Sequence, residues 1–289
     1  MIVLVGIAYI SSFFWAVSDN GEGRRFERTN VQLALMPPSW WPSNSDTHET
    51  KTLFGTDQLG RDLFARCVVG GAISICVGLF AACIAVFVGT AWGTIAGIYG
   101  GKADSAMMRA VDILYGLPSI MLVVLISVAA SSMLQNLATS MQELLNVVAL
   151  LAAIGIVSWL TVSRVVRGQV RSLMARPAME ACRVIGVGPI RTFTHHLFPA
   201  LLGTIIVYAT LTVPTAILSE AFLSFLGIGI KEPLPSWGNL TADGLGQLNP
   251  VHSRWWLLFW PSLCIAVTLV AMNWFGQGLR RKVELKSCV

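Results

Sequence analysis

The residues most able to bind a partner lie in one basic segment, residues 164–199, between two apolar stretches. This segment carries six arginines and a single acid: Arg164, Arg167, Arg171, Arg176, Arg183, Arg191 and Glu180. In a membrane protein, a short loop rich in arginine almost always faces the cytoplasm. We therefore predict that the segment lies on the cytoplasmic side of a membrane.

The middle of the segment predicts a short helix over about 177–186. Alanine, methionine, glutamate and arginine are strong helix formers, and Pro177 suits the first turn of a helix. Gly186 and Gly188 then end it. Below a bilayer its apolar side chains have no lipid to enter, so they need a protein partner: Met179, Val184 and Ile185.

Motifs for catalysis and for metal binding are absent from the sequence. Gly101-Lys102 lacks the upstream glycine and the following serine or threonine of a phosphate-binding GxxxxGK[ST] loop. There is no GxSxG or HExxH motif, and the six cysteines form no CxxC pair, so we interpret them as small buried apolar side chains. We expect no enzyme activity and no cofactor or metal bound by this chain. A transport function would take its energy from another polypeptide, with the basic segment as the contact.

The composition indicates an all-α membrane protein. Of 289 residues, 55% are hydrophobic and 12% are charged, whereas soluble domains are about one quarter charged. The net charge of +5 comes from helix ends and the basic segment, which is the pattern of cytoplasmic loops. We therefore expect contact with membrane lipid and no nucleic-acid partner.

Apolar stretches predict six transmembrane helices, at about 1–17, 68–98, 106–131, 144–163, 200–222 and 255–275. Arginine and lysine gather in 99–105, 164–199 and the tail, which places both termini in the cytoplasm. Residues 18–66 and 132–143 and the stretch from Gly227 to Arg254 are then outside loops. A cleaved signal sequence ending at Ala16-Val17-Ser18 is the alternative for the first stretch. The resulting divisions are 1–67 (first helix and outside loop), 68–281 (the other five helices with the cytoplasmic segment 164–199) and 282–289 (cytoplasmic tail).

Several local patterns carry structural predictions. Gly89, Gly93 and Gly97 line one helix face, which allows close helix packing in lipid, and Pro118 is expected to kink the third span. Spacing further predicts an ion pair between Arg109 and Asp112, a pair between Asp62 and Arg66, and a helix cap at Thr56 or Asp57. Trp40-Trp41 suggests a position at the outer membrane interface.

Glu220 is the one acid embedded in apolar sequence. It lies about 20 residues beyond Pro199, or roughly 30 Å along a helix, and therefore near the outer face. An ionisable residue at such a place is a functional candidate. A buried ion pair, or an interfacial glutamate without transport chemistry, is the equal alternative. We group Arg61 and Asp62 with it as candidates for a pathway or an outer gate.

The ordered motifs of residues 53–281 resemble those of ABC importer permeases. The basic segment matches their EAA motif through Glu180-Ala181-Cys182, Gly186 and Leu197-Phe198-Pro199. Supporting stretches are Gly55-Thr56-Asp57 with Gly60-Arg61-Asp62, Gly97 to Pro118, Ser219 to Gly227, and Pro235-Ser236-Trp237-Gly238. Within that family the chain is similar to the C-type subunits of dipeptide, oligopeptide and nickel importers.

The resemblance implies the type I importer permease fold and a coupling role for the basic segment. Glu180, Ala181, Cys182, Gly186 and Pro199 would belong to a helix that docks on a cytoplasmic ATPase. Implied partners are a second permease subunit, one or two ATPase subunits that use ATP and Mg, and an outside substrate-binding protein. The implied cargo is a dipeptide or oligopeptide, with nickel as the alternative within the family. A polytopic membrane enzyme and an assembly protein are the competing classes.

Overall fold

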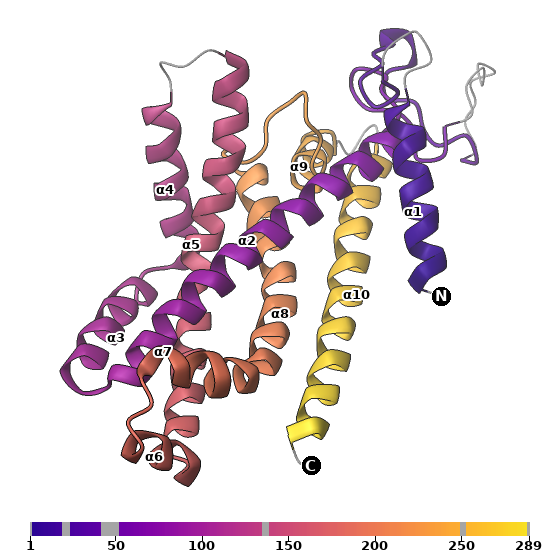
Figure 1. Cartoon of the computed structure of the whole chain (residues 1–289). Coiled ribbons are helices and arrows are strands. Elements are labelled where there is room, and N and C mark those ends of the chain that lie inside the picture. Colours follow the sequence, from indigo (N-terminus) through magenta and orange to yellow (C-terminus); the bar gives the residue numbers. More distant parts are fainter. Residues whose placement is uncertain (1, 19–23, 42–51, 135–138, 249–252, 288–289) are drawn as a thin grey trace. The chain divides into compact units, whose positions relative to one another are not determined.

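A computed structural model describes residues 2–18, 24–41, 52–134, 139–248 and 253–287. The helices are α1 (Ile2–Val17), α2 (Leu63–Tyr99), α3 (Gly101–Tyr115), α4 (Ser119–Met133), α5 (Thr139–Met174), α6 (Pro177–Val184), α7 (Pro189–Thr192), α8 (Phe198–Phe225), α9 (Trp237–Gly246) and α10 (Trp256–Ser287), as Figure 1 shows. A 3₁₀ turn, η1 (Val31–Leu33), and a π-helical turn, η2 (Phe193–Leu197), complete the elements, and the described residues contain no β-strand. Parts of the three predicted outside loops lie outside the described residues.

The chain forms two compact units, which are described separately. One contains Met1–Cys76 and Glu220–Leu269, and the other contains Val77–Ser219 and Val270–Val289. The second unit holds α3 to α7, and the first holds α1, α9 and the segment that precedes α2. Residues of α2, α8 and α10 are divided between the two units.

The glycine face of α2 packs tightly against α5 in the second unit. A Cβ atom on Gly93 would lie 2.5 Å from the Ser163 carbonyl oxygen, and one on Gly89 would lie 2.6 Å from the Val162 Cβ. A Cβ on Gly97 would lie 2.6 Å from a Val170 methyl carbon. Only glycine permits this approach, so the predicted close packing is confirmed.

The predicted third span is broken at Pro118 rather than gently kinked. α3 and α4 meet at an angle of 88°, and Pro118 stands at the N-terminal cap of α4. Proline lacks the N–H that a continuing helix needs and disfavours helical geometry in the residue before it. α4 then runs beside α5 (Figure 1).

Three arginines of the basic segment belong to α5 and hold α3: Arg164, Arg167 and Arg171, whose Nη1 lies 3.5 Å from Asp104 Oδ2. Arg164 donates to Asp112 at 2.7 Å and stacks over the Tyr115 ring, and Arg167 forms a bidentate pair with the buried Asp104. The predicted Arg109–Asp112 pair is therefore wrong. Asp112 takes its partner from α5, because packing brings a guanidinium there that spacing along α3 does not reveal.

Four of the described helices are long and apolar enough to cross a membrane: Leu63–Tyr99, Leu145–Met174, Ile190–Phe225 and Trp256–Arg281. The bent pair of α3 and α4 raises the number to five if it forms one span. α1, with 16 residues, is not among them, so the count of six and the placement of both termini stay predictions. Pro214 lies inside α8, as its position in the fifth apolar stretch predicts.

Candidate functional site

The connecting segment, residues 175–199, joins α5 to α8 and contains the predicted coupling helix as α6. The Arg176 carbonyl accepts the first two helical bonds, from the Met179 and Glu180 amides at 2.9 and 3.3 Å. Glu180 lies in the first turn of α6, where the positive end of the helix dipole favours a carboxylate. The predicted helix is confirmed, and its regular part ends at Val184.

Gly186 stops α6 through its backbone conformation. Its φ is +79°, in the left-handed region that favours glycine. The Val187 amide donates to the Cys182 carbonyl at 3.0 Å, and the Ile185 amide donates to that of Ala181 at 3.1 Å. This bonding pattern satisfies carbonyls that the helix end leaves free, and it turns the chain towards α7.

The connecting segment exposes large apolar side chains. Val184 is 84% exposed, and Ile185 and Ile190 are each 79% exposed. Met179 is half-buried, Glu180 and Ala181 are exposed, and the free thiol of Cys182 is half-buried. Pro199 is exposed in the first turn of α8. The segment therefore presents an apolar surface with one acid, which suits a protein contact.

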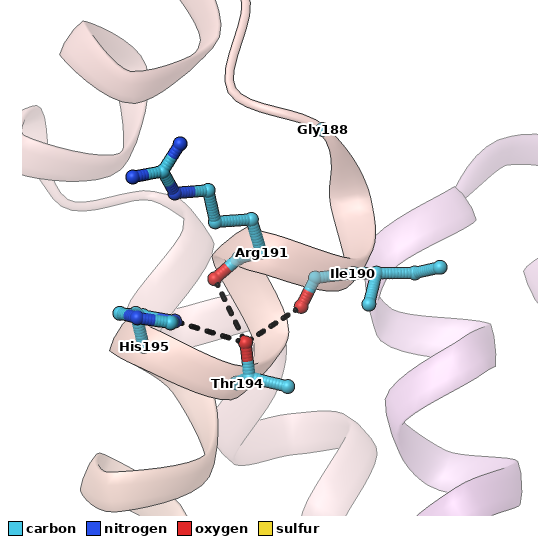
Figure 2. Close-up of a pocket in the computed structure, with 5 residues that line it drawn as sticks. All are labelled: Gly188, Ile190, Arg191, Thr194 and His195. Carbon is cyan, nitrogen blue, oxygen red and sulfur yellow. Dashed lines mark hydrogen bonds between the residues drawn. The ribbon is translucent and has the colours of Figure 1, made fainter.

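A hollow of about 600 Å³ lies on the same segment, lined by Gly188, Ile190, Arg191, Thr194 and His195 (Figure 2). The Thr194 hydroxyl lies 3.1 Å from the Ile190 carbonyl oxygen, 3.4 Å from that of Arg191 and 3.0 Å from His195 Nδ1. The sequence reasoning missed this hollow. The π-helical turn η2, which presents Thr194 and His195, has no evident signal in the local sequence.

In the first unit, four side chains form a charge cluster: Asp57, Arg61, Arg66 and Glu232. Asp57 Oδ2 accepts from Arg61 Nε at 2.6 Å and from Arg66 Nη1. Glu232 Oε1 accepts from Arg61 Nη2 at 2.6 Å and from Arg66 Nη2 at 2.9 Å. The cluster ties the start of α2 to the segment between α8 and α9.

Asp62 lies beside this cluster but has another task. Its Oδ1 accepts from the Phe64 amide at 2.9 Å, which makes it the cap of α2. The predicted cap at Thr56 or Asp57 and the predicted Asp62–Arg66 pair are therefore wrong. Arg66 pairs with Asp57 and Glu232 instead, because its buried guanidinium group needs carboxylate partners. The carboxylate of Asp62 already accepts from the backbone at the start of α2.

Glu220 is completely buried within the first unit. Its carboxylate accepts from Ser224 Oγ at 2.7 Å and from Ser74 Oγ at 3.0 Å. Ser74 Oγ also accepts from the Trp237 amide at 3.3 Å, at the start of α9. Glu220 thus joins α2, α8 and α9 through hydroxyl groups, and its part in transport stays a prediction.

Comparison with known proteins identifies the family of this chain. Residues 89–285 match the family of binding-protein-dependent transport system inner membrane components. The chain belongs to this family. It is therefore an inner-membrane component of a binding-protein-dependent transport system, the class that contains the permease subunits described next.

Individual relatives of this permease are similar over most of its length. It is 40% identical over 263 residues to the oligopeptide transport system permease protein OppC of Bacillus subtilis, covering 90% of this chain and 77% of that one. It is 43% identical to OppC of Escherichia coli K12, covering 88% and 80%. Identity to the dipeptide permease DppC of Bacillus subtilis is 40%, covering 81% and 68%.

A solved structure shows the same fold for the permease. The inward-facing MetNI methionine ABC transporter matches with a TM-score of 0.56 and 16% identity, covering 75% of this chain and 95% of that chain. The helical permease architecture predicted from the sequence is therefore confirmed at the level of the fold.

Acid is expected to weaken the charge cluster of this permease through Glu232. Burial raises the pKa of Glu232, but hydrogen bonds from Arg61 and Arg66 outweigh it and hold the pKa below its ordinary value. A carboxylate whose pKa is lower in the folded state than in the unfolded state stabilises the fold at pH values above its unfolded pKa, about 4.3. The stabilisation is lost as the pH falls through the pKa of the folded state.

The matching measurement compares thermal unfolding of the wild type and Glu232→Gln between about pH 6 and pH 3. We expect the variant to be less stable near pH 6 and the difference to shrink below about pH 4. Burial also raises the pKa of Asp62, which contributes with the opposite sign equally in both proteins. The pKa of Asp243 is raised by burial and by the charge of Glu232, so its contribution is smaller in the variant. A difference that stays constant with pH would contradict the prediction.

Proposed function

We propose that this chain is a translocation subunit of an ATP-driven importer for oligopeptides or dipeptides. The observation that carries the proposal is its identity to OppC and DppC permeases over most of its length. The chain would work with a second permease subunit, one or two cytoplasmic ATPase subunits that use ATP and Mg, and an outside substrate-binding protein.

The proposed topology has six spans, with α1 as the first and the α3–α4 pair as the third. Both termini then lie in the cytoplasm with α6. The distribution of arginines supports this orientation, since short cytoplasmic loops carry an excess of basic residues. The outside face would hold the charge cluster and α9.

The coupling proposal assigns α6 to a groove of an ATPase subunit. The proposal is supported by three exposed apolar side chains, Val184, Ile185 and Ile190. Exposing such side chains to water is unfavourable in free energy, and burial against a protein partner would remove this cost. Glu180, Ala181 and Cys182 would lie in the contact, and Gly186 and Pro199 would set the direction of the chain on either side. Movement of the ATPase would pass through this contact to α5 and α8.

An uptake assay tests the function. The chain is expressed with its partner subunits and binding protein, and uptake of labelled dipeptides, longer peptides and Ni²⁺ is measured. We expect ATP-dependent uptake of peptides that is lost when this chain is omitted. Uptake of Ni²⁺ without peptides would assign the alternative cargo, and uptake of neither would refute the proposal.

Glu220→Gln tests the pathway proposal. We expect altered peptide uptake or an altered substrate range with unchanged membrane insertion, because glutamine keeps a hydrogen-bond acceptor but loses the charge. Ser219→Ala is the matched control, since the hydroxyl of the half-buried Ser219 donates within its own helix, to the Thr215 carbonyl. If Glu220→Gln transports as the wild type does, Glu220 serves packing alone.

A further inference from the structure

The two carboxylates of the charge cluster are held very differently. Asp57 accepts four hydrogen bonds, two from the Leu59 and Arg61 amides at 2.9 and 2.8 Å and two from guanidinium groups. Glu232 has two bonds to the cluster, both through Oε1. The side chain of Asp57 is 9% exposed, whereas that of Glu232 is 46% exposed. Glu232 is therefore the exchangeable member of the cluster.

The side chains of Arg61 and Arg66 are buried more deeply than the Glu232 carboxylate that they bind. The Arg66 side chain is 1% exposed, and its Nε is buried without a hydrogen-bond partner. The Arg61 side chain is 10% exposed. Two buried guanidinium groups thus face one half-exposed carboxylate, and Nε of Arg66 is a buried donor without a partner.

We propose that Arg61 and Arg66 form a binding site for a ligand carboxylate, and that Glu232 occupies this site in the conformation described. Guanidinium groups match carboxylates in geometry and charge. The choice of a peptide's C-terminal carboxylate as the ligand rests on the proposed function. The ligand would displace Glu232 and take over its bonds.

Exchange is favourable only if another anion arrives. Loss of Glu232 alone would leave two buried cations with a single carboxylate, which is strongly destabilising. An entering carboxylate restores the pairing and frees the segment between α8 and α9. That segment continues into Ser236, which caps α9 by accepting from the Asn239 amide at 3.2 Å, so occupancy of the site is transmitted to α9.

Rescue by a small carboxylate tests the site directly. The complete importer complex with Glu232→Ala in this chain is purified, and its thermal unfolding is measured with acetate or with neutral acetamide. We expect the variant to unfold at a lower temperature than the wild type, and acetate but not acetamide to restore most of the loss. Glu27→Ala, at an exposed acid of the same unit, should respond to neither.

A second measurement uses transport and the conservative change Glu232→Gln. Uptake of one peptide is compared as free acid and as C-terminal amide, in the wild type, Glu232→Gln and Glu27→Gln. Because the internal competitor loses its charge, we expect Glu232→Gln to raise the acid-to-amide ratio roughly tenfold, the effect of one good charge-assisted contact. The binding protein is the same in all three, so the change reports on this chain.

The outcomes separate the two proposals. Equal effects of acetate and acetamide, or an unchanged acid-to-amide ratio with intact peptide uptake, would overturn the carboxylate site and leave the cluster as a structural clamp. Absence of peptide uptake by the wild type would instead refute the proposed function. Rescue by acetate would then decide alone whether the arginines bind a carboxylate.

Discussion

The combined change Glu180→Lys with Gly186→Pro is expected to lower ATP-driven uptake at least about tenfold while the chain stays in the membrane. Gly186 has a φ of +79°, and proline holds φ near −65°. The bond from the Val187 amide to the Cys182 carbonyl would be lost, and α6 would point elsewhere. Lysine in the first turn also opposes the helix dipole. Uptake and ATP hydrolysis are measured together, since uncoupling leaves hydrolysis without transport.

Two single variants serve as controls for the backbone argument. Gly188 lies two residues further on, its φ is not positive, and a Cβ there meets nothing within 4 Å. Gly188→Ala should therefore transport normally. Gly186→Asn should retain much of the activity, because asparagine tolerates left-handed geometry. Wild-type uptake by the double variant would refute the coupling assignment.

Gly93→Ala is expected to destabilise the second unit by about 1–3 kcal/mol, the range for overpacking a close contact. The added Cβ would lie 2.5 Å from the Ser163 carbonyl oxygen and 2.9 Å from the Arg167 amide nitrogen. Both are backbone atoms, so no side chain can rotate away and α2 must move off α5. Thermal unfolding of the detergent-solubilised chain and its level in the membrane measure the loss.

Gly168→Ala, on α5, is the matched control. Gly168 is exposed, and a Cβ there meets nothing within 4 Å. Alanine should leave stability unchanged or raise it by up to about 1 kcal/mol, because it favours a helix more than glycine does. Equal stability of the two variants would contradict the close approach of α2 and α5.

Local features of this protein were readable from the sequence. The helix over 177–184 and its stop at Gly186 follow from a proline, a run of helix formers and a glycine. The glycine repeat on α2 predicted close packing, because residues four apart share a helix face. Ordered motifs predicted the permease family. Each of these features depends on residues that are close together in the sequence, so residue types and their spacing were enough to predict it.

Partners in the charged contacts were decided by tertiary packing. Arg66 and Glu232 are 166 residues apart in sequence, and Arg164 reaches Asp112 across 52 residues. Local spacing suggested Asp62 and Arg109 as partners instead, and both predictions were wrong. An ion pair forms where packing brings opposite charges together away from water, because a buried charge must be paired. The charge cluster, and the unused donor of Arg66 within it, could therefore be found only in the folded chain.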